Sequence, residues 1–495
     1  MNVGIAHSVA LLGLNPHRVR IEAHIGQGLP GFTVLGISGN AGIQAGRRVS
    51  AALGACGHRV GQRKVLVNLA PADVVKRGAR YDLAIAVAVL RALGEVPAGD
   101  DVLLGELALT GQIRGVPGVL PSVLGLDHAT VSAQDGAEAT VAGVRTIVAV
   151  DSLGDYIAVA KGERRPDPPH AVGLSDSPRA GPNLADVAGQ PEARRALEVA
   201  AAGGHHLLLL GPPGAGKSML ARRLPGLLPP LDATQGLTVA SVASVAGRLQ
   251  PAARLPRAIP FAAPHHSASA AALLGGGSGI ARPGAVSEAT HGVLFLDELF
   301  EWSRRTLDGL REPMDEGVVR LARTAGTVTY PAEFLLVAAS NPCPCGPARS
   351  GCRCRFDVIE RYRARLTGPL ADRFDLAPLI EAVPAAALAD TAHNEATEVV
   401  ARRVARARAR AADRGPWLNA RAPLDVIRST ADPEVLDVLV RAVRSGRLSA
   451  RGFDRALRVA RTCADLSGTA RIMSADAHEA VSHRARLDRV WEIAA

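Results

Sequence analysis

A glycine-rich loop near the middle of the chain has the residues needed to bind phosphate. It matches the pattern G-x-x-x-x-G-K-S/T without a mismatch. The loop consists of Gly211, Pro212, Pro213, Gly214, Ala215, Gly216, Lys217 and Ser218. An apolar run, 207–210, precedes it, and a helix is predicted over 219–224. In such a strand–loop–helix unit the backbone N–H groups surround phosphate. We therefore expect ATP here, with Lys217 against the β- and γ-phosphates and Ser218 on Mg²⁺.

Two further apolar runs end in polar residues that suit the same chemistry. The run Val293–Leu296 is followed by Asp297 and Glu298, and a later run ends at Asn341. Buried parallel strands have this composition, and ligands bind at their carboxyl ends. We expect Asp297 to hold Mg²⁺ and Glu298 to polarise the attacking water. In an NTPase with an additional strand, Asn341 would lie between the other two strands and orient that water.

Length and composition limit the class of protein. A chain of 495 residues has room for two or three domains. The net charge of +10 suits an anionic partner, with nucleic acid as the first candidate. No apolar run approaches the ~18 residues of a membrane span. Six cysteines in so long a chain are typical of a reducing cytosol. We expect a cytoplasmic protein with no membrane partner.

The chain divides into three predicted domains and a linker. Residues 1–160 have the pattern of an α+β domain, with strands over 19–24 and 64–69 and an apolar helix over 82–93. Residues 161–183 contain five prolines and few apolar residues, which indicates a linker. A nucleotide-binding α/β domain is predicted over 184–380, and a helical lid over 385–495.

Arginines supply two further catalytic candidates. Arg373 lies between Asp372 and Asp375. One interpretation is a local salt bridge, and the other is an arginine finger that stabilises charge on a neighbouring subunit's γ-phosphate. Arg451 begins a predicted helix in the lid and could reach the nucleotide, although Arg455 and Arg458 compete for that role.

The order of these motifs resembles the magnesium-chelatase-like branch of AAA+ ATPases, and most closely the ComM/YifB family. The resemblance covers nearly the whole chain, and its most specific motifs are those over 263–269 and 341–346. The motifs that carry it occupy 68–73, 263–269, 292–299, 341–346 and 368–375. Membership implies an AAA+ P-loop NTPase core with an insert near 263–287 and a hairpin near 316–333, both facing a central pore. It also implies a homo-hexameric DNA motor linked to branch migration during natural transformation.

The N-terminal domain resembles the Lon-protease (ribosomal S5 domain 2-like) fold through the hairpin signature at 105–115. Catalysis in that family needs a serine and a lysine. Residues 71–90 contain no Ser or Thr, and the alignment puts Tyr81 at the serine position and Leu120 at the lysine position. Without a nucleophile and a base there is no dyad. We therefore expect a scaffold or a DNA-side collar, not a protease.

Four of the six cysteines, Cys343, Cys345, Cys352 and Cys354, lie within twelve residues. They could hold a tetrahedral Zn²⁺. Their C-x-C spacing is tighter than the usual C-x-x-C, so small buried side chains or a redox-labile loop stay open as alternatives. Cys56 and Cys463 are predicted core residues. His265 and His266 are adjacent, which favours a pore-loop or packing role over metal binding.

Two groups of arginines are candidates for DNA contact. Arg320 and Arg323 fall in the predicted hairpin, which the family architecture places in the pore. Arg402, Arg406, Arg410 and Arg414 recur every four residues, and for them we favour a solvated helix face. The sequence thus predicts an ATP-hydrolysing ring motor on branched or single-stranded DNA, a branch-migration helicase or translocase. The alternative is a magnesium-chelatase-like or chaperone-like remodeller of a protein partner. A peptidase motor is disfavoured by the missing dyad.

Overall fold

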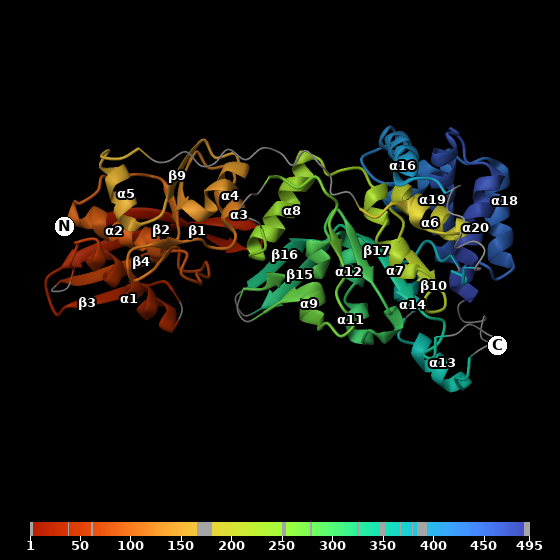
Figure 1. Cartoon of the computed structure of the whole chain (residues 1–495), viewed down its shortest axis with the longest axis horizontal. Coiled ribbons are helices and arrows are strands. Elements are labelled where there is room, and N and C mark those ends of the chain that lie inside the picture. The colour runs from red at the N-terminus through yellow and green to blue at the C-terminus, as the bar shows by residue number, and fades with distance from the viewer. Residues whose placement is uncertain are drawn as a thin grey trace.

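The protein is elongated, and its N-terminal, central and C-terminal parts follow one another along the long axis (Figure 1). The structure is a computed structural model. It describes residues 3–37, 39–60, 63–165, 181–249, 254–277, 280–323, 326–346, 352–366, 368–378, 380–383 and 394–489. Most of the predicted linker, 166–180, lies outside these ranges, as do the first residues of the predicted lid, up to 393. None of the helices in the described ranges is long and apolar enough to cross a membrane.

Within residues 3–165 the described strands form a seven-stranded sheet in the order β3-β4-β2-β1-β5-β8-β9. Its strands are β1 (Val3–Leu12), β2 (Asn15–Gly26), β3 (Gly31–Leu35), β4 (Lys64–Ala70), β5 (Val102–Leu104), β8 (His128–Ser132) and β9 (Thr146–Val150). A small hairpin pairs β6 (Glu106–Leu107) with β7 (Ile113–Arg114). The strands expected over 19–24 and 64–69 are confirmed as parts of β2 and β4.

Helices pack on this sheet through nearly continuous apolar surfaces. They are α1 (Asn40–Ala55), α2 (Asp82–Leu93), α3 (Val119–Val123), α4 (Gly136–Val141) and α5 (Leu153–Ala160). The predicted helix over 82–93 is confirmed, and all but two of its residues are buried. Because apolar residues make up all of α2 except Asp82 and Arg91, the helix lies inside the domain, against β1 and β2.

The central part contains a four-stranded parallel sheet in the order β10-β17-β14-β11. These strands are β10 (Leu207–Leu210), β11 (Phe261–Ala262), β14 (Val293–Leu296) and β17 (Leu335–Ser340). A single parallel bridge from Leu207 to Leu376 marks a fifth strand position beside β10. Every residue of β10, β14 and β17 is buried, as expected of a parallel sheet covered on both faces.

The helices of this part are α6 (Pro191–Gly203), α7 (Lys217–Ala221), α8 (Ala233–Val245), α9 (Ala270–Leu274), α10 (Ala285–Glu288), α11 (Arg304–Asp308), α12 (Arg311–Glu316), α13 (Phe356–Arg363) and α14 (Gly368–Ala371). The helix expected over 219–224 begins earlier, at Lys217, because the loop itself forms its first turn after Gly216. It ends at Ala221 and is followed by a 3₁₀ turn over Leu224–Leu227.

Two short hairpins extend from the central sheet. Within the predicted insert, 263–287, β12 (Gly275–Gly276) pairs with β13 (Arg282–Pro283). The hairpin expected near 316–333 is confirmed as β15 (Val318–Arg323) paired with β16 (Gly326–Pro331). Their placement in a pore stays a prediction, since it requires a ring.

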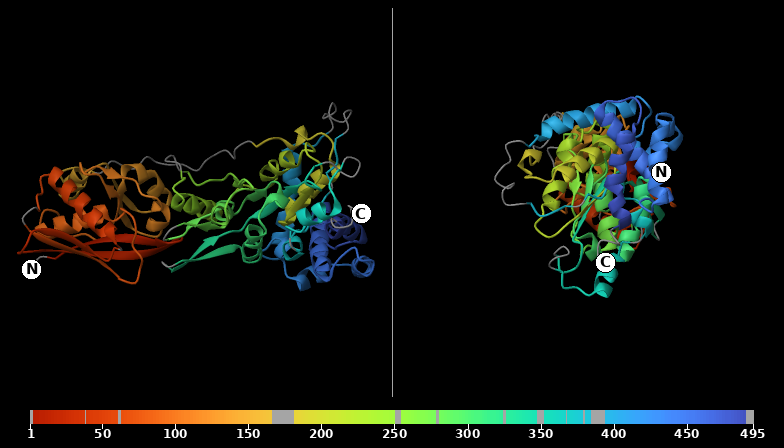
Figure 2. Two further views of the ribbon diagram at one scale, coloured as in Figure 1. Left: turned by 90° about the horizontal axis from the view of Figure 1, so that it is seen from below. Right: turned by 90° about the vertical axis from the view of Figure 1, so that its right-hand side faces the viewer.

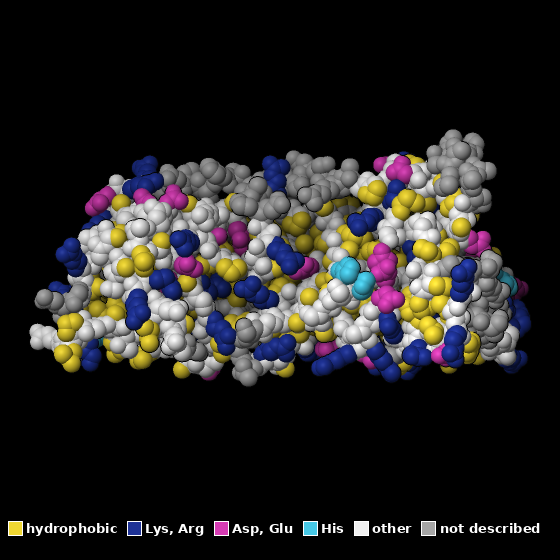
Figure 3. Space-filling model, turned by 60° about the horizontal axis from the view of Figure 1, so that its bottom comes forward, with side chains coloured by type: hydrophobic (Ala, Val, Ile, Leu, Met, Phe, Trp, Pro, Cys, Tyr) yellow, Lys and Arg dark blue, Asp and Glu magenta, His cyan; other side chains and the backbone are white. Residues whose placement is uncertain are grey.

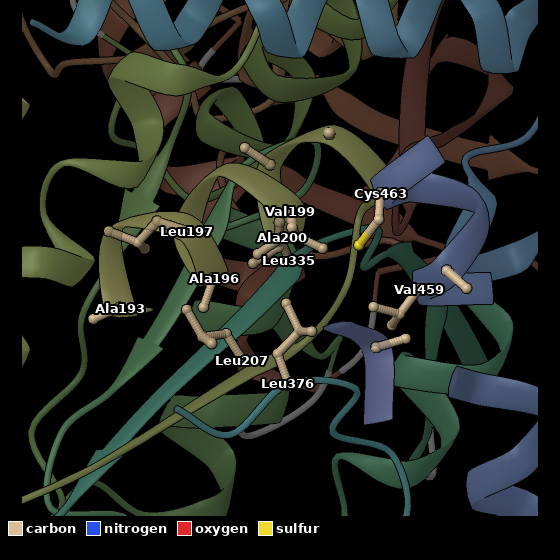
Figure 4. Close-up of a cluster of buried hydrophobic side chains, with 14 of the residues drawn as sticks. Ala193, Ala196, Leu197, Val199, Ala200, Leu207, Leu335, Leu376, Val459 and Cys463 are labelled. Carbon is tan, nitrogen blue, oxygen red and sulfur yellow. The ribbon is translucent and has the colours of Figure 1, made fainter. Parts of the chain in front are cut away.

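The C-terminal part is helical and shares a core with the central sheet. Its helices are α16 (Thr397–Ala412), α17 (Leu424–Ser429), α18 (Pro433–Arg444), α19 (Ala450–Ser467) and α20 (Ser474–Arg489). Figure 4 shows Val459 and Cys463 of α19 in one cluster with Ala200 of α6, Leu207 of β10 and Leu335 of β17. Cys463 is fully buried, which confirms its predicted place in the core. The C-terminal helices are therefore packed directly against the central sheet.

Among the described residues, the N-terminal part contacts the central part at two places, and the view from below shows the two parts side by side (Figure 2). Helix α3 packs on α8, where the N–H of Gly118 donates to the carbonyl of Ser244 over 3.0 Å. The tip of the β1–β2 hairpin lies on β16, since a Cβ added at Gly13 would stand 2.8 Å from Val328. The N-terminal part thus touches the same hairpin that carries Arg320 and Arg323.

Candidate active site

The predicted phosphate-binding lysine is held by groups on two elements. Lys217 Nζ donates to the carbonyl oxygens of Gly211 and Pro212, over 2.7 and 2.8 Å, and to Asn341 Oδ1 over 2.9 Å. Burial lowers the pKa of Lys217, while the nearby Asp297 and Glu298 oppose that shift. The ammonium group is therefore in place beside the loop, with hydrogen bonds that an anionic ligand could replace.

The first residue of the phosphate loop, Gly211, packs tightly against the backbone of Ile380. A Cβ added at Gly211 would lie 2.2 Å from the backbone oxygen of Ile380. Only glycine fits there, so the segment that follows the fifth strand position fixes the start of the loop.

The two predicted magnesium ligands meet directly. Ser218 Oγ donates to Asp297 Oδ2 over 2.7 Å, although 79 residues separate them. A hydroxyl and a carboxylate are oxygen donors of the kind that Mg²⁺ takes together with phosphate oxygens. The residues present therefore fit a nucleotide-bound magnesium ion, with Ser218 and Asp297 as its protein ligands.

Glu298 follows Asp297 in an unusual conformation. Its backbone φ is +50°, one of three positive values among the described non-glycine residues. Strained backbone of this kind gathers at functional sites. It turns the Glu298 carboxylate toward His266, whose Nδ1 lies 2.7 Å from Oε2.

The contact between His266 and Glu298 was not expected from the sequence, which favoured a pore-loop or packing role for both histidines. The neighbouring His265 instead directs Nδ1 to Ser267 Oγ, 2.7 Å away. The order of the strands in the sheet would have indicated this contact. Because β11 pairs with β14 in parallel, the residues after Ala262 leave the sheet at the same edge as Glu298. Histidine and acidic side chains lie together on the face of the central part seen in Figure 3.

Asn341 follows β17, which pairs with β10 on one side and β14 on the other. This is the predicted position between the two motif-bearing strands. Its side chain contacts Lys217, so the phosphate loop and this strand end are joined by a hydrogen bond. Its role toward a water molecule stays a prediction.

Arg373 is not among the groups that surround Lys217. It forms an ion pair with Asp315, with Nε 2.9 Å from Oδ1, and it also donates to the carbonyl of Pro369. The sequence left a salt bridge and an arginine finger open, and the chain by itself shows the salt bridge. A finger acts on a neighbouring subunit's nucleotide, so that role stays a prediction.

The three arginines at the start of α19 have different surroundings. Arg451 is exposed and lies 3.1 Å from Asp372. Arg455 lies 2.8 Å from the buried carboxylate of Asp375. Arg458 donates to the carbonyl of Ala422 over 3.0 Å. Of the three, Arg451 has the partner that would be easiest to exchange, because its ion pair is at the surface.

The arginine stripe over 402–414 is not a uniform solvated face. Arg402 and Arg406 are exposed. Arg410 and Arg414 instead bind Asp465 of α19, Arg410 through the backbone oxygen at 2.7 Å and Arg414 through the carboxylate. Asp465 is buried, so half of the stripe joins two lid helices.

The hairpin arginines also differ from each other. Arg320 forms ion pairs with Glu312 and Glu316 of α12. For Arg323 the described hydrogen bond is to the backbone oxygen of Ala322, over 2.9 Å. In the N-terminal part, Tyr81 and Leu120 are both buried in the core.

The four clustered cysteines are brought together. Their Sγ atoms all lie within 4.8 Å of one another. Cys343 and Cys345 follow Asn341 closely in the chain, so the group lies beside the candidate nucleotide site.

A parallel sheet with a phosphate loop after one strand, two acids after another and a polar residue after the strand between them defines a P-loop NTPase with an additional strand. The family models agree with this class. Residues 183–388 match magnesium chelatase subunit ChlI, residues 394–484 match the ChlI C-terminal region, and residues 21–133 match a further model of subunit ChlI of Mg-chelatase.

Similar proteins extend the match to almost the whole length. YifB of Escherichia coli (strain K12), an uncharacterized protein, is 41% identical over 99% of this chain and 98% of its own. An uncharacterized protein of Mycobacterium tuberculosis (strain ATCC 25618 / H37Rv) is 44% identical over 94% and 96%. Competence protein ComM of Haemophilus influenzae is 38% identical over 98% of both chains. The chain belongs to the ComM/YifB family of magnesium-chelatase-like AAA+ proteins.

Proposed function

We propose that this protein is an ATP-hydrolysing ring motor that acts on DNA. The observation that carries the ATPase part is the meeting of four predicted residues at one edge of the sheet. Lys217 contacts Asn341, and Ser218 contacts Asp297, at 2.9 and 2.7 Å. Family membership supports the same activity, because AAA+ proteins use this arrangement on ATP and Mg²⁺.

Each residue has a defined task in the proposed reaction. Lys217 compensates charge on the β- and γ-phosphates, and Ser218 and Asp297 hold Mg²⁺. Glu298 accepts a proton from the attacking water, and Asn341 orients that water. Arg373 of a neighbouring subunit and Arg451 of the lid stabilise the charge that develops on the γ-phosphate.

We propose DNA as the partner because the chain is positively charged and because of the name of one of its relatives. The chain has a net charge of +10, and a relative of nearly equal length is named competence protein ComM. Arg323 extends from the β15–β16 hairpin without an acidic partner among the described interactions, so its charge is available to a phosphate. We propose a homo-hexamer that encircles branched or single-stranded DNA in the cytoplasm and drives branch migration.

The N-terminal part fits a structural role in this proposal. We assign it a Lon-like fold without protease activity, because Tyr81 and Leu120 are buried where a nucleophile and a base would be needed. Its β1–β2 hairpin packs on β16, so it would stand as a collar beside the hairpins that face DNA.

A remodeller of a protein partner is the second candidate. It is favoured by the magnesium chelatase models and by the 67 kDa magnesium-chelatase subunit of Heliobacterium mobile, which is 31% identical over 32% of this chain. Such a protein would hydrolyse ATP at the same residues but would not respond to DNA.

The deciding experiment measures ATP turnover with and without a four-way DNA junction, together with displacement of its strands. We expect the junction to stimulate turnover and ATP to drive strand exchange. Lys217→Ala should abolish ATP binding. Glu298→Gln should bind ATP but lose turnover, because the proton-accepting carboxylate is gone. Turnover that is normal but indifferent to every DNA substrate would favour the protein remodeller.

The hairpin is tested through salt dependence. Arg323→Ala should weaken DNA binding equally across sequences and flatten the slope of log affinity against log salt by up to ~0.9 per lost duplex phosphate contact. Arg320→Ala, its matched control on the same strand, should change the slope less, since Glu312 and Glu316 already compensate its charge. An unchanged slope in the variant that combines Arg320→Ala with Arg323→Ala would remove the hairpin from the DNA interface.

A further inference from the structure

Four thiols form a compact group at the turn after β17. Cys343 lies 3.4 Å from Cys345 and 3.4 Å from Cys352, and Cys345 lies 3.6 Å from Cys352, measured between Sγ atoms. With Cys354 included, all four sulfurs lie within 4.8 Å of one another. Two C-x-C segments thus point their side chains at one shared point.

These separations match a single tetrahedral ion. Zn–S bonds of about 2.3 Å hold four sulfurs about 3.8 Å apart. A cluster of several irons binds its thiolates on different irons and would hold them farther apart. A disulfide would need an S–S distance of about 2.05 Å, whereas the structure gives all six cysteines as thiols. The geometry therefore favours one metal ion over an iron–sulfur cluster or a disulfide pair.

Backbone groups around the sulfurs suit thiolate ligands. The N–H of Arg353 donates to Cys345, and the N–H of Cys345 donates to Cys354. Such hydrogen bonds orient the ligands of a metal and offset part of their negative charge. They also cross-link the two C-x-C segments, although residues 347–351 between them lie outside the described ranges.

The cysteine turn is joined to the candidate nucleotide site on one side and to α13 on the other. Asn341, which contacts Lys217, is two residues before Cys343. A Cβ added at Gly346 would lie 3.0 Å from the ring of Pro213 in the phosphate loop. On the other side, the guanidinium of Arg363 in α13 donates twice to the carbonyl of Pro342, over 3.1 and 3.0 Å.

We infer that Cys343, Cys345, Cys352 and Cys354 bind one Zn²⁺ ion, and that this ion fixes the turn carrying Asn341 against the phosphate loop. No open coordination position is left for catalysis, because four protein sulfurs complete a tetrahedral site. The zinc is therefore structural, and the four cysteines are positioning residues for the nucleotide site. The site itself does not depend on the proposed motor function, whereas its effect on turnover does.

Metal content tests the site without reference to activity. The purified full chain should contain one zinc per chain by mass spectrometry, and replacement by Co²⁺ should give the intense sulfur-to-cobalt charge-transfer bands of a tetrahedral thiolate site. Cys345→Ser and Cys354→Ser should lose both the zinc and the bands. Cys56→Ser is the matched control, since it removes a thiol of the N-terminal part and should keep both.

Several results would overturn the zinc site. One is that the wild-type protein binds neither Zn²⁺ nor Co²⁺ at the cysteines. Another is that it shows an iron chromophore in place of zinc. The third is that Cys56→Ser loses as much metal as the other variants. Should the cysteine variants fail to fold, the cobalt spectrum of the wild type decides the question by itself.

The positioning role is tested by removal and return of the ion. Chelation with 1,10-phenanthroline should lower ATP turnover about tenfold or more with little change in ATP affinity, because Lys217 and the loop remain. Added Zn²⁺ should restore the wild type but not Cys354→Ser. Unchanged turnover in zinc-free protein would overturn the positioning role, and absence of ATPase in zinc-loaded protein would instead count against the proposed function.

Discussion

Among single residues, the contact of His266 with Glu298 leads us to expect that the histidine restrains the proposed base. Glu298 needs a carboxylate oxygen able to accept a proton from water. His266 Nδ1, 2.7 Å from Oε2, occupies one side of that carboxylate. While this contact holds, Oε2 is not open to the attacking water.

His266→Ala should therefore raise ATP turnover in the absence of DNA by about two- to tenfold, a modest part of the range for acid–base catalysis. We expect DNA to stimulate turnover by releasing Glu298 from His266. Stimulation by DNA should therefore be smaller in this variant, in which the contact is already absent. Steady-state turnover with and without DNA measures both effects. His265→Ala is the control, because His265 contacts Ser267 instead. A slower enzyme after His266→Ala would show that the histidine aligns Glu298 rather than restraining it.

At the scale of elements, α19 places similar residues in different environments. Arg451 and Arg455 are one helical turn apart, yet one pairs with Asp372 at the surface and the other with buried Asp375. Burial would raise the pKa of Asp375, but Arg455 and His205 hold it well below its usual value. The Asp375 carboxylate is therefore charged inside the protein and depends on its partner.

Arg455→Ala should cost about 3–5 kcal/mol of unfolding free energy, because it leaves a buried charge without its main partner. Arg451→Ala should cost less than about 1 kcal/mol, but it should slow ATP turnover if Arg451 reaches the nucleotide from the lid. Denaturant unfolding and steady-state turnover of both variants separate the two roles. Equal stability of the two variants would contradict the assignment of the buried pair.

At the scale of the whole molecule, the proposed ring would require each subunit to complete its neighbour's site. Arg373 pairs with Asp315 within its own chain, on a part-exposed surface. In a ring this surface would face the next subunit's nucleotide.

Arg373→Ala should bind ATP normally but hydrolyse it at least ~10³-fold more slowly, as with other arginine fingers. Mixing this variant with Lys217→Ala protein should restore part of the activity, because some interfaces then combine an intact loop with an intact finger. The mixed-variant ATPase assay measures the rescue. If the two variants assemble together but the mixture stays inactive, Arg373 is not an arginine finger and its role is the salt bridge to Asp315.

The junction between the N-terminal and central parts contains buried acids. Glu138 accepts hydrogen bonds from Ser244 of α8 and from the N–H of Leu120, and burial raises its pKa. Nearby, Asp135 accepts from the N–H of Val116 over 3.0 Å, and burial raises its pKa to about 7. The apolar cluster around them includes Ala240 of α8, so one core spans both parts.

A raised pKa means that the folded state binds the proton more tightly than the unfolded state. The stabilisation is complete below a pH of about 4 and is lost as the pH rises toward 7. Asp135→Asn should therefore be less sensitive to pH over this window, and more stable than the wild type above pH 7 by up to a few kcal/mol. Unfolding midpoints from pH 4 to 8 test this, with exposed Asp127→Asn as the control. Parallel curves for wild type and Asp135→Asn would contradict it.

Local chemistry could be predicted from the order of the residues alone. The phosphate loop, the acids at 297 and 298, the apolar strands and helix 82–93 could be predicted because each depends on neighbouring residues, through backbone geometry and hydrophobic period. Residue order also indicated the family, since its motifs are contiguous.

Contacts between side chains far apart in the sequence depend on the three-dimensional fold. The approach of His266 to Glu298 depends on β11 lying beside β14, and the packing of Arg410 and Arg414 on Asp465 depends on how α16 crosses α19. The same holds for the convergence of the four cysteines, which spacing alone left open. Helical periodicity places residues on one face but does not say what covers that face. Strand order and helix packing supply that information, because they fix contacts between residues far apart in the chain.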